Sequence, residues 1–379
     1  ADSDVAASLS AKTECSLGLL VGVTHEGYAS VYHNVFTPPT VVPLPQNLSG
    51  ILNTSLDDAG AMYADWMLEH SRQVSRLLPS GLQVLGIFIT ESEASLLELR
   101  STSKLLQPLT QLLAELCAEL TLSFALLYCA SSKQQHICRL FEGGQPRLVE
   151  LNVQPLPDLI DFQCNVQISL AYTGETRTTQ VALQALLEQF GEEIKSARIN
   201  AEGAKGTEKV TSIGKNDVSL YFKKPALLQR TGRPVCILKG TLDCRVSVSP
   251  ELKVNDLEVL IKLDLLKSLR VRLELSDPEQ KLVTNSLSQS ILALPRRIVH
   301  RTHKNMLFCD YLLPGETFEV SRQRLQELAG ITSLEIEHSE ERSEVPMPAP
   351  KGSTGLAIAA VVVAVLLALI AAFESNLWA

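Results

Sequence analysis

The sequence has few aromatic residues and no excess of positive charge. Aromatic side chains make up 5% of the 379 residues, and 34 Lys and Arg stand against 42 Asp and Glu, which gives a net charge of −8. No block of Lys or Arg is interleaved with aromatic residues. Nucleic-acid surfaces depend on such basic patches. The composition therefore argues against a nucleic-acid partner.

Motifs of the common catalytic and cofactor sites are also missing. The sequence contains no CxxC pair, no HExxH, no Walker glycine loop, no GxSxG and no GxGxxG. His300 and His303 form a close histidine pair, but they lack a neighbouring acidic residue that would support a zinc site. Cys129, His136 and Cys138 fit a hairpin whose thiols face the core better than a metal site. We expect no cofactor and no metal.

The sequence shows no need for disulfide bonds. Its eight cysteines are an even number, which would suit a disulfide framework, yet a chain of this length buries a core without cross-links. Several of them lie in apolar, strand-like segments, as Cys129 does. We expect free, buried thiols in a reducing compartment.

A long apolar segment near the end is the most distinctive feature that the sequence does have. Residues 352–373 carry no charge, and the stretch 355–373 is long enough, at ~1.5 Å per residue, to cross a hydrocarbon layer of roughly 30 Å. The alternative is a buried core helix, which rarely lacks polar residues on every face. We expect a single transmembrane helix. Its anchoring residues include Gly355, Leu356, Val361, Leu366, Leu369 and Phe373.

The segments around this span indicate its orientation. The first residues carry acids where a signal peptide has positive charge, and Lys351 precedes the span whereas no Lys or Arg follows it. Glutamates and prolines at 337–354 predict a solvated tether. We expect a tail-anchored protein with the bulk of the chain in the cytosol and a short luminal tail at 374–379.

The rest of the sequence alternates strand-like and helical segments, which predicts an α/β (α+β) fold in two domains. The first domain, 1–153, is expected to have the order ββαβαβββ and to begin with a hairpin. Its expected elements are strands at Leu17–Val23 and Tyr28–Phe36, a helix at Ser55–Leu78, a strand at Leu82–Thr90, a helix at Glu93–Glu119, and strands at Leu122–Ala130, His136–Phe141 and Pro146–Val153.

A second mixed α/β domain, 160–336, begins after a proline-containing segment. The stretch Asn200–Asn216 is polar and rich in Gly and Lys, which predicts a loop. The other expected elements are strands at Asp161–Tyr172, Val235–Val248, Arg297–Thr302 and Leu334–Ile336 and helices at Thr179–Ala197, Val254–Leu275 and Phe318–Ala329.

The predicted helix and strand at 65–89 resemble the odorant-response-abnormal protein four family. The matching residues there include Trp66, Glu69, His70, Gln73, Val74, Ser75, Arg76, Pro79, Gly81 and Gly86. Further similar segments are Cys129-Ala-Ser, Cys138-Arg, Leu238-Lys-Gly, Cys244-Arg and Leu307-Phe-Cys-Asp-Tyr, which contains Cys309, Asp310 and Tyr311. With the terminal span, the resemblance covers nearly the whole chain. We expect these residues to support the fold or to bind a partner, and His70 to be packed on its helix rather than to act as a base.

The resemblance implies an N-terminal MPN-like domain in a tail-anchored protein of the endoplasmic reticulum. Such proteins bind the cysteine protease that removes the ubiquitin-fold modifier, recruit it to the membrane and support the trafficking of membrane receptors. A heterodimer of two MPN-like domains is the expected mode of binding. Active MPN proteases hold zinc through histidines that follow a strand, where this sequence has Thr90, Glu91, Ser92 and Glu93. The resemblance thus implies a non-catalytic adaptor and not an enzyme.

Two other functions stay open. A chaperone-like trafficking factor would contact the transmembrane spans of receptors directly, through small residues such as Ala359, Ala360 and Ala364. Exchanging residues 352–379 for an unrelated tail anchor would separate this function from that of an adaptor. A cryptic metalloprotease would carry stoichiometric zinc, which metal analysis would detect.

Overall fold

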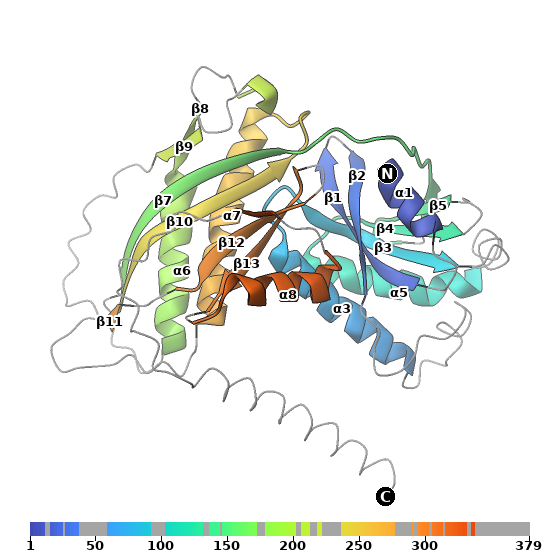
Figure 1. Cartoon of the computed structure of the whole chain (residues 1–379), viewed down its shortest axis with the longest axis horizontal. Coiled ribbons are helices and arrows are strands. Elements are labelled where there is room, and N and C mark those ends of the chain that lie inside the picture. Colours follow the sequence, from blue (N-terminus) through green and yellow to red (C-terminus); the bar gives the residue numbers. More distant parts are fainter. Residues whose placement is uncertain are drawn as a thin grey trace, which may run out of the picture.

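The computed structural model has a mixed α/β fold, as the sequence predicts. The described residues form six α-helices, one 3-10 helix and four β-sheets (Figure 1). These residues are 1–11, 16–25, 27–37, 59–91, 103–131, 136–144, 146–172, 179–201, 206–212, 218–221, 236–276, 290–291, 294–302, 305–313, 315–331 and 335–337.

A six-stranded sheet forms the first part of the structure, with the strands in the order β2-β1-β3-β4-β5-β6. β1 and β2 form the predicted hairpin, and β3 lies parallel to β4 because helix α5 connects them. Helices α3 and α5 cover one face, where Leu19 and Leu127 of the sheet share a core with Met67 and Leu113. From β1 onward, the described elements follow the predicted order ββαβαβββ. The bounds are β1 Ser16–His25, β2 Tyr28–Phe36, α3 Ala59–Leu77, β3 Gln83–Glu91, α5 Ser103–Leu120, β4 Ala125–Ser131, β5 His136–Phe141 and β6 Arg147–Val149.

Helix α1 (Ser3–Ser10) lies against the other face of this sheet and is absent from the sequence prediction. The side chain of Asp2 accepts a hydrogen bond from the amide of Asp4 at 2.9 Å and caps the helix. Val5 and Leu9 pack against the side of the sheet that contains Phe88. A helix of only two turns gives too short a periodic pattern to be recognised in the sequence.

The second part is a long antiparallel pair of strands, β7 and β10, backed by helices α6 and α7 (Figure 1). The segment predicted as a polar loop contains the end of β8 and the 3-10 helix η1, so that prediction is wrong in part. The bounds are β7 Ile160–Tyr172, α6 Thr179–Ser196, β8 Arg198–Ala201, η1 Val210–Ser212, β9 Val218–Tyr221, β10 Cys236–Val248, α7 Val254–Leu275 and β11 Ser290–Ile291.

The third part is a small sheet of β12 (Arg296–Arg301), β13 (Leu307–Leu312) and β14 (Glu335–Glu337) with helix α8 (Phe318–Ala329). Helix α8 contacts β13, α3 and β2. Phe308 and Leu325 belong to the same apolar cluster as the side chains between the first sheet and α3. This core therefore contains residues from both sides of the predicted domain boundary at 153–160, which itself stays a prediction.

The predicted tether and transmembrane helix lie outside the described residues. This holds for all six anchoring residues, Gly355, Leu356, Val361, Leu366, Leu369 and Phe373. Within the part of the chain that the structure describes, no helix is both long and apolar enough to span a membrane. The tail anchor at 355–373 stays a prediction.

Candidate functional site

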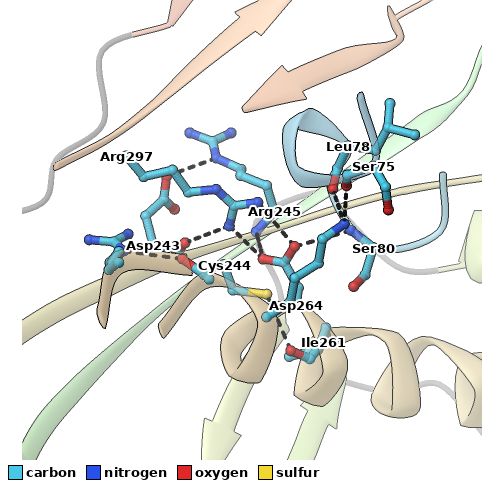
Figure 2. Close-up of polar contacts among 12 residues, drawn as sticks. Ser75, Leu78, Ser80, Asp243, Cys244, Arg245, Ile261, Asp264 and Arg297 are labelled. Atoms are coloured by element: carbon cyan, nitrogen blue, oxygen red, sulfur yellow. Dashed lines mark hydrogen bonds and ion pairs between the residues drawn. The ribbon is translucent and has the colours of Figure 1, made fainter. Parts of the chain in front are cut away.

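The end of helix α3 meets α7, β10 and β12 at a buried cluster of charged side chains, which we call the junction. Asp264 and Lys267 come from α7, Asp243 and Arg245 from β10, and Arg297 from β12. Figure 2 shows the acidic and arginine side chains of this cluster converging beside the turn that follows α3. Both aspartates are fully buried, and the two arginines are at most 6% exposed. Charges in such an interior need partners of opposite sign.

Asp264 is the centre of the junction. Its carboxylate accepts two hydrogen bonds from the guanidinium of Arg297, from Nη1 at 2.6 Å and from Nη2 at 3.0 Å. It also accepts hydrogen bonds from the amides of Ser80, at 3.1 Å, and Arg245, at 2.9 Å. Burial by itself raises the pKa of Asp264, but Arg297 and the two amides outweigh it and hold this pKa below its usual value. One ionised carboxylate thus joins three separate segments of the chain.

Arg297 extends the network toward β10. Its Nη1 also donates to the main-chain oxygen of Asp243 at 3.1 Å, and the carboxylate of Asp243 accepts a hydrogen bond from Arg245 Nε at 3.0 Å. Burial lowers the pKa of Arg297, yet the adjacent Asp264 raises it well above the ordinary value. Opposite charges therefore face one another throughout the junction, and Arg297 stays protonated.

Lys267 binds the end of helix α3 directly. Its Nζ donates to the main-chain oxygens of Ser75 and Leu78, both at 2.7 Å. These carbonyls lie at the end of α3, where the Ser75 oxygen also accepts the amide of Leu78 at 3.4 Å, and a cation at this end complements the helix dipole. Burial lowers the pKa of Lys267 to about 8, against the opposing effect of Asp264. The ammonium of one helix thus caps another helix from a distant part of the sequence.

The turn after α3 approaches β10 so closely that it requires glycine. Gly81 has φ +95°, and a Cβ at this position would lie 2.1 Å from the carbonyl oxygen of Ser247. The amide of Ser247 donates to the oxygen of Ser80 at 3.0 Å. Gly86 allows a similar approach inside the sheet, because a Cβ there would lie 2.0 Å from the oxygen of Leu126. Both glycines are explained by packing of main chain against main chain.

The sequence similarity to known proteins identifies the family. A family model described as Odorant response abnormal 4-like, or ODR4-like, matches residues 18–341. The chain belongs to the ODR4-like family. Proteins described as "Protein odr-4 homolog" are similar along most of their length: that of Pongo abelii is 26% identical over 85% of this chain and 80% of its own, that of Xenopus laevis 22% over 76% and 74%, and that of Homo sapiens 25% over 73% and 70%. The predicted family resemblance is confirmed.

A solved structure, that of UfSP from C. elegans, is distantly similar to this ODR4-like chain. The TM-score is 0.41 at 9% sequence identity, and the alignment covers 88% of this chain and 56% of the other. The chain thus spans little more than half the length of that structure. The family assignment rests on the sequence matches alone.

The second group of residues on which the predicted family resemblance rests also reaches the junction. Cys309 lies on β13 beside Arg297 and forms a hydrogen bond with it, and burial raises the pKa of its thiol to about 11. The ring of Tyr311 lies 5.4 Å from the guanidinium carbon of Arg272 on α7. Asp310, which points to the other side of the strand, forms an ion pair with Arg324 of α8 at 3.4 Å. Two motifs more than two hundred residues apart therefore meet at one buried site.

The residues of α3 on which the predicted resemblance rests divide between the inside and the outside of the helix. His70 and Val74 are buried, whereas Trp66 is 40% exposed and the neighbouring Met67 lies in the core instead. The outward side chains form surface pairs, Gln73 with Glu69 at 2.9 Å and Arg76 with Glu274 at 3.4 Å. A role of Trp66, Glu69, Gln73 and Arg76 in partner binding stays a prediction.

Both ring nitrogens of His70 have partners within the fold, and one of these partners belongs to α8. Its Nε2 lies 2.7 Å from the main-chain oxygen of Leu328, so Nε2 carries the proton, and Nδ1 accepts a hydrogen bond from Thr37 Oγ1 at 3.1 Å. Burial lowers the pKa of His70, which favours this neutral form. The predicted role as a packed helix histidine is confirmed.

The residues considered as metal ligands are dispersed in the structure. Cys129 and Cys138 lie on the two strands of the predicted hairpin and belong to cores on opposite faces of the sheet. His300 contacts Ser321 at 2.8 Å, and His303 lies outside the described residues. Among the described residues, no group of three or more His, Cys, Asp and Glu side chains is placed to hold a metal ion. Thr90, which stands where the resemblance places the histidines of active MPN proteases, accepts a hydrogen bond from the amide of Ser16 at 2.9 Å.

The charged centre of the junction was not found by sequence reasoning. Asp264 lies on the buried row of α7 together with Leu257, Ile261 and Ser268. A carboxylate that follows Leu257 and Ile261 on a mainly apolar helical row was the available signal, because such a residue needs a buried partner. The sequence does not say which of its many arginines provides that partner.

Proposed function

We propose that this ODR4-like protein is a non-catalytic membrane adaptor. In this proposal it binds the cysteine protease that removes the ubiquitin-fold modifier, brings it to the endoplasmic reticulum through the predicted anchor at 355–373, and supports the trafficking of membrane receptors. One observation carries the proposal. The motif residues Ser75, Gly81, Cys309 and Tyr311 meet at the buried junction, where they fix parts of the fold to one another.

The use of these residues supports a binding platform rather than a catalyst. A catalytic motif places reactive side chains where a substrate can reach them. Here Cys309 is fully buried with a raised pKa, and Ser75 and Gly81 contribute main-chain contacts. A rigid platform supports binding because its surface needs no ordering when a partner arrives. The curated relatives are described as odr-4 homologs and not by an enzymatic activity, which also supports an adaptor.

In this proposal, the predicted anchor lets the adaptor act by placing the protease at the membrane, which requires no catalytic group. Restricting a protease and its substrates to one membrane surface raises their effective concentration and needs no new contact at the active site. We infer that the folded domains select the protease and that the predicted span selects the membrane. Pairing of an MPN-like domain of this chain with one of the protease is the mode that we propose.

Membrane fractionation tests whether the folded domains bind the protease and the predicted span directs the complex to the membrane. The full chain, a version with residues 352–379 exchanged for an unrelated tail anchor, and a version without these residues are compared for the distribution of the protease. We expect both anchored versions to carry the protease into the membrane fraction and the third to leave it soluble. Failure of the purified full chain to bind the protease would contradict the proposal. Loss of receptor trafficking in the exchanged version alone would instead support direct contact with receptor spans.

Metal analysis tests the non-catalytic part separately. The full chain is purified without chelator, and its zinc content is measured together with that of the Cys129→Ser/Cys138→Ser variant. We expect no stoichiometric zinc in either protein. Stoichiometric zinc in the wild-type chain would overturn the assignment as a non-catalytic protein while leaving protease binding untouched.

A further inference from the structure

Two cysteines in the second part of the structure lie directly opposite each other. Cys164 of β7 pairs with Cys244 of β10 in an antiparallel register that runs without a shift. Both side chains are buried in the same apolar cluster, so they point to the same face of the strand pair. Among the cysteines that the structure describes, no other two are cross-strand partners. The fold thus brings together two thiols that lie far apart in the sequence.

The geometry of this pair suits a disulfide bond. Residues directly opposite each other in antiparallel strands have Cα atoms about 4.5 or 5.5 Å apart. A disulfide bond needs a Cα separation of about 4.4–6.8 Å and Cβ atoms that point toward each other. Burial raises the pKa of Cys244 well above its ordinary value, and the neighbouring Asp264 and Cys164 raise it further, as two adjacent thiols do. The bond can therefore form without a change in the pairing of the strands.

Both thiols are free in the structure, and each has a main-chain partner on a different element. The Sγ of Cys244 donates to the oxygen of Ile261 on α7 at 3.6 Å (Figure 2). Cys164 forms a hydrogen bond with the main chain of Leu220 on β9. Burial raises the pKa of Cys164 to about 11, so both thiols are protonated at pH 7. Such thiols react slowly, and the pair stays reduced until an oxidant reaches it.

We propose that Cys164 and Cys244 are a redox-sensitive pair, which hydrogen peroxide closes to a disulfide bond that cross-links β7 to β10. Cys164 reacts first, because it is 4% exposed whereas Cys244 is fully buried. Its thiol gives up a proton, and the sulfur attacks one oxygen of the peroxide. The O–O bond breaks, the hydroxide that leaves takes up the proton, and Cys164 becomes a sulfenic acid.

The second thiol completes the reaction. The sulfur of Cys244 attacks the sulfur of the Cys164 sulfenic acid, so that an S–S bond forms and the S–O bond breaks. The oxygen leaves as water with the proton of the Cys244 thiol and the hydrogen of the sulfenic acid. The two thiols together lose two electrons, which reduce one molecule of peroxide to two molecules of water.

The cross-link lies beside the junction. Cys244 is placed between Asp243 and Arg245 on β10, and Ile261 lies one turn before Asp264 on α7 (Figure 2). Formation of the bond turns the Cys244 sulfur away from the Ile261 oxygen, while β10 becomes covalently joined to β7. The proposal goes beyond the adaptor function, since the bond needs neither the protease nor the predicted anchor.

Oxidation of the purified full chain under native conditions tests this inference. The reduced chain is treated with hydrogen peroxide, the remaining thiols are alkylated, and linked peptides are identified by mass spectrometry. Hydrogen exchange of the β7 and β10 amides is measured before and after the treatment. Cys164→Ala removes one partner of the pair. The matched control is Cys129→Ser/Cys138→Ser, because these cysteines also lie on two paired strands but belong to cores on opposite faces of their sheet.

We expect peptides linked through Cys164 and Cys244, a loss of these two thiols, and exchange of the β7 and β10 amides that is slower by about tenfold or more. Dithiothreitol should reverse all three changes. Cys164→Ala should abolish the link and the slower exchange, and the control variant should show both. Absence of the link in the wild-type chain would overturn the inference. An equally fast link between Cys129 and Cys138 would also overturn it, because oxidation would then follow unfolding rather than strand register. A link with unchanged exchange would contradict a bond that holds the two strands together.

Discussion

Two contacts hold the C-terminal half of the chain against helix α3, and they use opposite chemistry. At the end of the helix, the junction uses paired charges, with Asp264 bound to Arg297 and Lys267 bound to the last carbonyls of α3. Earlier in the helix, α8 is held through a neutral histidine, His70, whose Nε2 donates to the oxygen of Leu328. The same helix is thus fixed once by ions and once by an uncharged ring.

The uncharged contact contains two further histidines, and we call His33, His70 and His300 the histidine contact. His33 forms a hydrogen bond with the main chain of Ala329, and His300 Nε2 lies 2.8 Å from Ser321 Oγ. Burial lowers the pKa of all three rings, to about 4 for His33 and His300. All three are therefore neutral at pH 7, although they come from three different elements.

The difference between the contacts determines what each tolerates. A buried ion pair keeps its charges over a wide pH range but loses stability when one partner is removed, because the other remains charged in the interior. A buried neutral histidine tolerates the loss of a hydrogen bond better but is sensitive to acid, because protonation places a charge in the interior. The junction should therefore be sensitive to substitution and the histidine contact to pH.

Removal of Arg297 should have the largest effect. Arg297→Met leaves the carboxylate of Asp264 buried without its cation, and we expect a loss of about 3–5 kcal/mol in the free energy of unfolding. Urea unfolding measures this loss. Arg270→Met is the matched control, because Arg270 lies on the exposed side of α7, and it should change the stability by about 0.5 kcal/mol or less. A loss of that small size for Arg297→Met would contradict the central position of the ion pair.

Acid should break the histidine contact while the junction persists. The pKa of about 4 for His33 and His300 in the folded state lies below the unfolded value of 6.5. Their contribution to the free energy of unfolding is therefore complete above pH 6.5 and is lost as the pH falls toward 4. At roughly 1.4 kcal/mol per pH unit for each ring, the loss amounts to several kcal/mol. Asp310, whose pKa burial raises, opposes this loss.

Substitution at His300 isolates the titration. We expect His300→Gln to reduce the slope of the unfolding free energy between pH 6.5 and pH 4, because Gln can keep the hydrogen bond to Ser321 but does not titrate. Ser321→Ala removes the partner and leaves the ring, so it should lower the stability and keep the slope. An unchanged slope in His300→Gln would show that the ring does not titrate with folding.

Two glycines with nearly equal φ angles allow the backbone strain of a substitution to be measured separately from the clash of the added Cβ. Gly81 has φ +95° and meets the Ser247 oxygen, whereas Gly315 has φ +92° and nothing within 4 Å of its missing Cβ. We expect Gly315→Ala to lower the free energy of unfolding by about 1 kcal/mol through backbone strain alone. Gly81→Ala should lower it by about 3 kcal/mol, because the added Cβ also meets the Ser247 oxygen. Thermal unfolding of both variants measures the difference. Equal costs would mean that the turn can move away from β10.

Removal of a surface pair should have the smallest effect. Arg76 of α3 and Glu274 of α7 connect the same two helices as Lys267 does, but both side chains are about half exposed. Because solvent screens such a pair, Arg76→Ala should cost about 0.5 kcal/mol or less in urea unfolding. A loss near that of Arg297→Met would show that the surface pair, and not the buried cluster, connects the helices.

The sequence predicts the elements of this fold better than their contacts. The predicted bounds Val254–Leu275 and Phe318–Ala329 agree with α7 and α8, because amphipathic periodicity and end signals are local. The strand Leu307–Leu312 was recognised only as a family-like segment, and α1 was missed. Both are short elements whose stability comes from tertiary contacts rather than from local pattern.

The junction shows why the rest was not predicted. Gly81, Ser75, Cys309 and Tyr311 are all noticeable in the sequence, but their common site exists only after α3, α7, β10, β12 and β13 have been assembled. The choice of Arg297 as the partner of Asp264 depends on the register of β12 and on the packing of α7, which are set by non-local contacts. Local patterns contain no information of that kind.

Denaturant unfolding followed in two parts of the full chain tests most directly whether the junction makes them one unit. In a Trp378→Phe background, the fluorescence of Trp66 reports on α3, and pulsed hydrogen exchange of the β10 amides reports on the second part. We predict that both signals change at the same denaturant concentration. In Arg297→Met, this midpoint concentration should decrease equally for both signals. Two separate midpoints in the wild-type chain would contradict a junction that couples the two parts. So would a lower midpoint for the β10 amides alone in Arg297→Met.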